Sequence, residues 1–252
     1  MCLVVVAHAA AARYRFVIAA NRDELHARPT RHAGWWPEPP GLLGGRDLLA
    51  GGTWLGVDKH GRIAAVTNVR DGMPREAPRS RGALVTGYLS GGESAAGFAA
   101  LSTAAGGSFA AFNLLLFDGA ELWYASNRAS TVLLAHGVHS LSNAPFGVDW
   151  PKTVSAKNGA TQLLAADDPL EGLLDLLATR SSAESAEERY RGAHFMTGPV
   201  YGTRCSTVIL IDDGGILTFA ERSFDAGGSL TSEVRETFAI EPLPNASTDA
   251  QR

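Results

Sequence analysis

Short apolar runs, separated by turns rich in glycine and aspartate, recur along most of the chain. The first two runs, residues 2–8 and 14–20, are rich in valine and isoleucine, and an alanine-rich connection joins them. This pattern is typical of two buried strands in a hairpin. Later pairs of runs flank short turns that contain glycine, which predicts further hairpins and short strands. They are expected at residues 51–57 with 62–68, 111–117 with 121–126, 131–134, 137–142, and 205–211 with 216–221.

Helical patterns occupy two other parts of the chain. Residues 83–89 and 93–104 have helical composition, and the pair Gly91-Gly92 is expected to end the first of these helices. Between residues 152 and 179, leucines recur at helical spacing. Pro169 interrupts that segment and predicts two helices in place of one.

The remaining segments carry weaker signals. Residues 28–49 contain prolines that break any period and are expected to be irregular, with Trp35-Trp36 covering a pocket or pinning the loop to the core. Residues 181–188 are polar and either helix-prone or mobile. Antiparallel hairpins with helices packed outside them predict a layered α+β sandwich. We expect one domain over residues 1–240 and a disordered tail over 241–252.

Composition and charge restrict the class of protein. The chain has 252 residues, is 45% hydrophobic and carries a formal net charge of -4, without a basic stripe, which argues against nucleic-acid or anionic-membrane surfaces. No apolar run approaches the ~18 residues of a membrane span, so no stable membrane insertion is expected. Two cysteines, Cys2 and Cys205, do not make a disulfide framework and fit a reducing compartment. These features predict a soluble cytoplasmic protein.

Cys2 is the residue with the most distinctive chemistry. The start methionine is normally removed when a residue as small as cysteine follows it, which would make Cys2 the mature N-terminus. Free pKa values of about 8.5 for the thiol and about 7.7–8.0 for the α-amine bring nucleophile and base together in one residue. The alternative is a small buried hydrophobic residue that opens a strand.

Polar residues gather where the predicted strands end. They lie in five segments: residues 21–24, 68–70, 126–128, 141–143 and 201–204. Strand ends in a layered sheet converge on one rim, where pockets form. Asn68 and Asn143 have amide donors suited to a developing oxyanion, Asp23 could hold Cys2 in register, and Arg204 could lower the thiol pKa or anchor an anion. Each residue could instead cap a turn or pair with an acid.

Other kinds of site have little support. His136 and His139 would lie on opposite faces of a strand, so no metal site is expected. The glycine-rich segment 41–56 lacks the lysine and the helix start of a phosphate loop. No Gly-x-Ser-x-Gly nucleophile elbow occurs. Cys205 is expected to be a buried thiol without a bond to Cys2.

Seven ordered motifs resemble the NRDE family, the transport and Golgi organisation protein 2-like family. The resemblance runs from residue 1 to about residue 240. The motifs are Met1-Cys2, Asn21-Arg22-Asp23-Glu24, Gly44-Gly45-Arg46-Asp47 followed by Ala50-Gly51-Gly52-Thr53-Trp54-Leu55-Gly56, Thr67-Asn68-Val69-Arg70, Ser80-Arg81-Gly82, Leu141-Ser142-Asn143 and Tyr201-Gly202-Thr203-Arg204.

That family is similar to N-terminal-nucleophile hydrolases of the penicillin V acylase and bile salt hydrolase type, which implies a four-layer αββα sandwich. The similarity puts Cys2 on the nucleophile, Asp23 on the aspartate that positions it, and Asn68 and Asn143 on residues of the oxyanion site. The arginines depart from the pattern. Those hydrolases have an arginine where this chain has Ala20, and Arg204 stands in for their late arginine in a different local context.

Three functions remain open at this stage. The first is an amidohydrolase or acyltransferase for a small N-acyl amide or related acyl substrate, with Cys2 as nucleophile, Asn143 and Asn68 holding the oxyanion, and Asp23 and Arg204 in support. Substrate would be bound by five further residues: Asn21, Arg22, Trp54, Arg70 and Tyr201. This hypothesis requires no cofactor.

The second function is a non-catalytic carrier for haem, an acyl-CoA or a lipid. It would use the same pocket, with Trp35, Trp36 and Trp54 as walls and Cys2 or a histidine as an iron ligand if the ligand is haem. The third is a scaffolding role. The sequence leaves the oligomeric state undetermined.

Overall fold

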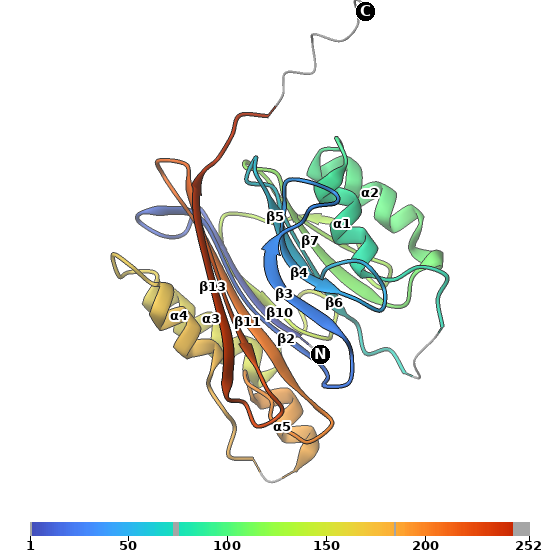
Figure 1. The fold of residues 1–252 in the computed structure, drawn as a ribbon, viewed down its shortest axis with the longest axis vertical. Helices are drawn as coiled ribbons and strands as arrows, with labels where there is room; N and C mark the ends of the chain where they lie inside the picture. The colour runs from blue at the N-terminus through green and yellow to red at the C-terminus, as the bar shows by residue number, and fades with distance from the viewer. Residues whose placement is uncertain (1, 73–75, 184, 244–252) are drawn as a thin grey trace, which may run out of the picture.

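The computed structural model describes residues 2–72, 76–183 and 185–243. Its strands form two fully antiparallel sheets (Figure 1). The first sheet has the order β10-β1-β2-β11-β12-β13, and its strands are Gly137–Leu141, Cys2–His8, Tyr14–Leu25, Tyr201–Asp212, Ile216–Phe224 and Leu230–Ala239. The second has the order β3-β4-β5-β6-β7-β8-β9, and its strands are Thr30–Trp35, Leu42–Asp47, Leu55–Asp58, Ile63–Asn68, Phe112–Phe117, Leu122–Ser126 and Val132–Leu133.

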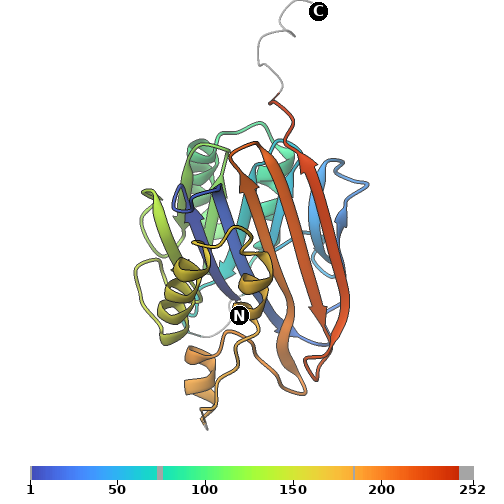
Figure 2. The same cartoon turned by 90° about the vertical axis from the view of Figure 1, so that its left-hand side faces the viewer.

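Helices cover the outer face of each sheet. Against the second sheet pack α1, Gly82–Ser90, and α2, Ala95–Ala104, followed by a 3₁₀ turn at Gly106–Ser108. Against the first sheet pack α3, Pro151–Leu163, and α4, Leu170–Leu177, which lie across it in Figure 2. A short helix α5, Ala186–Gly192, lies near the end of the sandwich where β1 begins, as both views show. The predicted four-layer αββα sandwich of class α+β is therefore confirmed.

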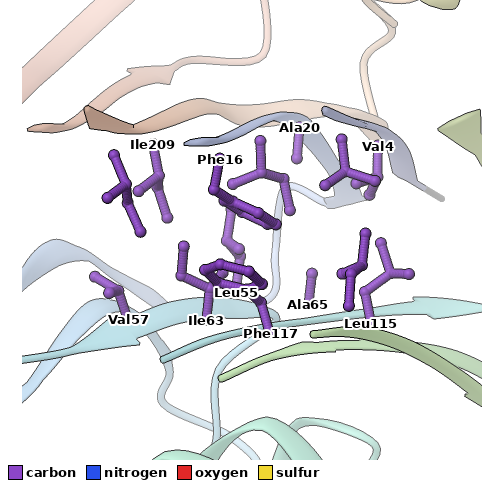
Figure 3. Packing of buried hydrophobic residues seen from close by; sticks show 14 of the residues in the cluster. Val4, Phe16, Ala20, Leu55, Val57, Ile63, Ala65, Leu115, Phe117 and Ile209 are labelled. Carbon is purple, nitrogen blue, oxygen red and sulfur yellow. The ribbon is translucent and has the colours of Figure 1, made fainter. Parts of the chain in front are cut away.

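Alternation along the central strands explains their unbroken apolar sequences. In β1, Leu3 and Val5 pack against α3 and α4, whereas Val4 and Val6 face the second sheet. Because both faces are covered, the strand is apolar throughout its length. Figure 3 shows the layer between the sheets, where Phe16 and Phe117 meet in a stacked pair with centroids 4.0 Å apart.

The prediction for residues 28–49 was wrong, because β3 and β4 lie there. β3 is an edge strand, and β4 carries Gly44 and Gly45 in its centre, so neither shows an alternating apolar pattern. Trp36 is buried and donates its indole N–H to the Gly44 carbonyl at 2.9 Å, which pins the loop. Edge strand β13 was not predicted either. Ion pairs such as Arg222–Glu233 at 2.8 Å join it to its neighbour β12.

The helices follow the prediction with small shifts. Two helices flank Pro169, as expected, and the polar segment after residue 180 contains α5, placed several residues later than the predicted 181–188. Residues 244–252 of the predicted tail lie outside the described residues. Within the described part of the chain, no helix is long and apolar enough to cross a membrane.

Candidate active site

Strand register brings Cys2 into the space between the two sheets. Cys2 begins β1 and pairs with Arg22 of β2. Side chains alternate along a strand, so Cys2 shares its face with Val4 and Val6, which belong to the core between the sheets. Cys2 is partly buried, and its thiol is free. Burial raises the pKa of the Cys2 thiol, and the Arg22 guanidinium opposes that rise.

A cavity of about 110 Å³ adjoins Cys2, and we call it the Cys2 pocket. Trp54 forms one side of it, and the Arg22 guanidinium carbon lies 4.3 Å from the centre of the Trp54 ring. Gly45 makes room for that ring, because a Cβ at this position would lie 2.2 Å from a ring carbon. Most of the lining is polar or charged. The lining residues are Cys2, Arg22, Asp23, Glu24, Arg28, Asp47, Thr53, Trp54, Val66, Asn68, Ser80, Arg81 and Gly82.

The segment after β10 holds the main chain of Cys2 at both of its polar groups. The Cys2 N–H donates to Oδ1 of Asn143 at 3.2 Å, and the Ser142 hydroxyl donates to the Cys2 carbonyl at 2.6 Å. Asn143 is buried, and its Nδ2 donates to the Asn68 carbonyl at 2.8 Å. No described acceptor takes the second N–H of that amide, which leaves it as a donor beside Cys2.

Asp23 lies on the opposite face of β2 from Arg22 and is buried. Its Oδ1 accepts from the Thr203 hydroxyl at 2.6 Å, and its carbonyl accepts from the Tyr201 hydroxyl at 2.9 Å. Burial raises the pKa of the Asp23 carboxyl, and the charge of Lys152 is among the interactions that oppose the rise. The substrate-binding residue predicted at Tyr201 therefore bonds to the backbone of Asp23.

Lys152 was missed by the sequence reasoning. It is 0% exposed, near the start of α3, and its Nζ lies 5.4 Å from the centre of the Tyr190 ring. Burial lowers the pKa of the Lys152 ammonium, and the Asp23 carboxylate opposes that effect. The spacing of Lys152, Ala156 and Ala160 was an available signal, since positions four apart share a helix face and the two alanines are core residues.

Asn21 lies away from the Cys2 pocket. It is buried on the helix-covered face of its sheet, where Nδ2 donates to the carbonyls of Leu177 and His194, each at 2.8 Å. Its Oδ1 accepts from the Ser206 hydroxyl at 2.6 Å. All these partners are structural, so Asn21 connects β2 to α4 and to β11.

Arg70 also lies outside the pocket lining. Its guanidinium is 3.2 Å from Glu187 of α5 and lies over the ring of Tyr190, with its carbon 4.9 Å from the ring centre. The side chain is more than half exposed. Arg70 thereby connects the segment after β6 to α5.

Arg204 occupies a bulge in β11, between Thr203 and Cys205. One of its terminal nitrogens, Nη1, donates to the carbonyls of Leu25, His26 and Arg28 at 3.0–3.2 Å. Burial lowers the pKa of the Arg204 guanidinium. The structure thus places Arg204 at the turn after β2, and it is not among the residues that line the Cys2 pocket.

A second, smaller cavity shares Trp54 with the Cys2 pocket, and we call it the Cys205 pocket. Cys205 is buried, and its thiol is free. Next to it, Glu221 accepts from the Ala33 N–H at 3.0 Å and from the Thr207 hydroxyl at 2.9 Å. Burial raises the pKa of the Glu221 carboxyl and raises that of the Cys205 thiol well above its ordinary value. Its lining comprises Thr30, Arg31, His32, Trp54, Arg204, Cys205, Glu221, Ser223 and Phe224.

Several charged residues of the Cys2 pocket were not singled out as site residues from the sequence. Arg28 forms an ion pair with Asp47 at 2.7 Å and lies 3.9 Å from Glu24. Arg81, from the start of α1, completes the charged wall. Asp47 and Arg81 stand within the quoted motifs, which was the one available signal. Among the described residues, no group of three or more His, Cys, Asp or Glu side chains could hold a metal ion.

Comparisons with known proteins connect the chain to one family and one fold. The profile of the family described as Transport and Golgi organisation 2 matches residues 1–226. The Transport and Golgi organization protein 2 homologs of Bos taurus and Homo sapiens are 34% and 32% identical over 239 residues, covering 83% of this chain and 87% of each homolog.

The similar solved structures are N-terminal-nucleophile hydrolases. One is a Caenorhabditis elegans ortholog of the N-acylethanolamine-hydrolyzing acid amidase, with a TM-score of 0.53, 12% identity, and coverage of 83% of this chain and 92% of that chain. Another is a mutant of the conjugated bile acid hydrolase from Clostridium perfringens, with a TM-score of 0.54, 9% identity, and coverage of 96% and 97%. At these identities the likeness shows the N-terminal-nucleophile hydrolase fold alone.

Proposed function

This chain belongs to the Transport and Golgi organisation 2 family, and on that premise we propose that it is an N-terminal-cysteine amidohydrolase or acyltransferase acting on a small N-acyl amide or related acyl substrate. The observation that carries the proposal is the position of Cys2. Its thiol adjoins a charged pocket, while Ser142 and Asn143 hold its backbone from both sides. A residue that only filled the core would need no such pocket beside its side chain.

The proposed reaction begins once Met1 has been removed and the nitrogen of Cys2 has become an α-amine. Oδ1 of Asn143, which accepts from that nitrogen at 3.2 Å, would keep the amine in place. The amine takes the thiol proton as sulfur attacks the substrate carbonyl, and a C–S bond forms. The remaining Nδ2 proton of Asn143 and the amide of Asn68 would then stabilise the oxyanion.

Collapse of the tetrahedral intermediate breaks the C–N bond. The leaving amine takes its proton from the α-ammonium of Cys2, and a thioester remains on the sulfur. Water, or a second amine in an acyltransferase, then attacks the thioester and restores the thiol. Asp23 would orient the amine from behind the strand. Arg22 takes the place of the missing arginine at Ala20, because it lies on the same face of β2, two residues nearer the pocket.

Mass spectrometry tests the mechanism directly. The intact protein should lack Met1 and should gain one carbamidomethyl group from iodoacetamide at near-neutral pH, and Cys2→Ala should prevent that gain. Inserting a lysine between Met1 and Cys2, which blocks methionine removal, should abolish turnover of every responsive N-acyl amide. Cys205→Ala serves as the matched control. Unchanged turnover after the insertion would exclude the α-amine as base.

One observation favours a carrier of an amphipathic ligand as a second candidate. Leu49, which is 70% exposed, donates its backbone N–H to the carboxylate of the pocket residue Asp47 at 3.0 Å. An exposed apolar side chain at this position could receive part of an acyl chain. Of the three tryptophans expected to form walls, however, only Trp54 lines the pocket. A titration with haem that gave no stoichiometric Soret change would remove haem from the possible ligands.

A further inference from the structure

The arginines of the Cys2 pocket differ in their partners. Arg28 has Asp47 at 2.7 Å and Glu24 at 3.9 Å. Arg22 lies 3.9 Å from Glu24, donates to the Thr30 hydroxyl at 3.2 Å and lies over the Trp54 ring. Both guanidinium groups are therefore fixed by residues of the protein.

Arg81 is different. Its terminal nitrogen Nη1 donates to the Ala111 carbonyl at 3.2 Å, but no described carboxylate lies within ion-pair distance of its guanidinium. The side chain is partly buried, and burial lowers the pKa of the guanidinium. A partly desolvated guanidinium with unused N–H donors at the wall of a cavity is suited to bind a carboxylate in a two-pronged contact.

The fold brings this residue close to the pocket by a tight backbone contact. Gly52 lies against Gly82 at the start of α1, and a Cβ on Gly52 would lie 2.5 Å from the Gly82 carbonyl carbon. The first N–H groups of α1 already bond to Ser80 and Arg81, at 3.0–3.3 Å. The Arg81 guanidinium therefore remains as a positively charged donor on this wall of the pocket.

The size of the cavity limits where a bound anion can lie relative to Cys2. Both Cys2 and Arg81 line the same space of about 110 Å³, well below the roughly 300–1,000 Å³ of pockets for drug-sized ligands. A carboxylate on Arg81 and a carbonyl at the Cys2 sulfur must therefore be separated by few bonds. An α-amino acid in amide linkage meets that requirement, because its carboxylate is two bonds from the amide nitrogen.

We propose that the substrate is an N-acyl amino acid whose carboxylate is bound by Arg81. This inference rests on the proposed function and names its substrate class. The C–N bond that breaks is the one between the acyl carbon and the amino acid nitrogen. The free amino acid leaves with a proton on nitrogen, and the acyl group stays on Cys2 until water releases it as a carboxylic acid.

A matched pair of compounds tests the proposal. N-butanoylglycine and N-butanoylglycinamide differ only in the carboxylate. The wild-type protein should favour the carboxylate compound by about tenfold or more in kcat/KM, mostly through KM, since the contact is made in the ground state as well. Arg81→Met should remove the preference, and Arg81→Lys should retain part of it. Arg79→Met is the control, because Arg79 lies over Phe109 outside the pocket lining.

Binding without turnover is followed through protection of Cys2 from iodoacetamide. N-butanoylglycine should slow labelling more than the glycinamide, and this difference should vanish in Arg81→Met. If neither compound is hydrolysed but this protection is seen, the anion site stands while the proposed hydrolysis fails. Equal hydrolysis of both compounds, unaffected by Arg81→Met, would overturn the anion site and leave the hydrolase.

A third outcome assigns Arg81 a different role. If Arg81→Met shifts the pH profile of Cys2 labelling upward and lowers turnover of both compounds equally, then Arg81 stabilises the thiolate, and the substrate inference is wrong. Preference for butanamides that carry a carboxylate on the acyl side would overturn the assignment to the amino acid part. Circular dichroism and thermal unfolding of each variant establish that it is folded before its kinetics are interpreted.

Discussion

The Cys2 pocket and the Cys205 pocket place the same chemical group in two contrasting environments. Cys2 and Cys205 both pair with Arg22 of β2, one from each side, and Trp54 lines both cavities. Yet Cys2 begins its strand and adjoins the larger cavity, whereas Cys205 lies within β11 beside the buried Glu221.

Burial raises the pKa of both thiols, and the shared Arg22 guanidinium, which lowers both values, does not cancel that rise. A carboxylate adds to the rise at each thiol, Asp23 at Cys2 and Glu221 at Cys205, and the pKa of Cys205 is raised well above its ordinary value. At Cys2, Ser142 and Asn143 contact the main chain and so fix the position of the sulfur. Reactivity should depend on access and on what surrounds the strand end.

The largest expected difference between the two pockets is in turnover. Cys2→Ala should lower kcat on any responsive N-acyl amide by at least about 10³-fold, since the nucleophile is removed. Cys205→Ala should change kcat less than about twofold and cost about 1 kcal/mol of stability as a small buried truncation. Steady-state kinetics and thermal unfolding measure both. Equal losses in the two variants would mean that the cysteines act as one site.

The polar residues beside the two cysteines should also differ in their effect on kcat. Asn143→Ala should reduce kcat by about 10²–10³-fold, the usual effect of removing one oxyanion donor. Thr207→Val, on the Cys205 side, should leave kcat nearly unchanged but destabilise the fold by about 1–3 kcal/mol, because Glu221 loses a donor. If both variants lost stability and neither lost kcat at saturating substrate, Asn143 would have only a structural role.

The sequence predicted the layered fold because its central strands are apolar on both faces, as in residues 3–7. It failed at β3 and β13, since edge strands with few buried side chains leave no clear period, and it failed at β4. Gly44 and Gly45, within β4, further disguised a strand as a loop. The strands that could be predicted from the sequence are those with both faces buried, and strand propensity alone was not enough.

The candidate site, like the fold, could be predicted from the sequence only in part. Cys2, Arg22, Asp23 and Asn68, which were predicted at strand ends, line one pocket together with Trp54. Asn21 does not, because where both faces of a strand are covered, the sequence does not reveal which face a polar residue meets. Its amide instead satisfies carbonyls beneath α4.

One further residue illustrates the same limit. Arg204 lies in a bulge, and no pattern in the sequence marks the extra residue that shifts its register. Lys152, by contrast, could have been found, because a lysine at the spacing of two core alanines must be buried when the helix packs on the sheet.

Removing the barrier between the two pockets gives a smaller expected effect. Trp54→Ala should destabilise the fold by about 2–3 kcal/mol, since the ring is partly buried. It should also let iodoacetamide reach Cys205 in the native protein, with labelling about tenfold faster than in wild type. Trp35→Ala, at the sheet edge beside Phe238, is the control. Unchanged Cys205 labelling would show that Trp54 does not separate the two cavities.

The smallest expected effect is the pH dependence that Glu221 gives to stability. Burial raises the pKa of this carboxyl, so between the unfolded value of about 4.3 and the higher folded value the native state binds the proton more tightly. Below that pH window, the contribution of the protonated Glu221 to the free energy of unfolding is fully present. It falls by about 1.4 kcal/mol per pH unit as the pH rises through the window. Glu221→Gln cannot ionise, so its stability should exceed that of wild type increasingly with pH across the window. Urea unfolding at successive pH values measures the difference. Parallel profiles for the two proteins would mean that Glu221 stays charged when buried.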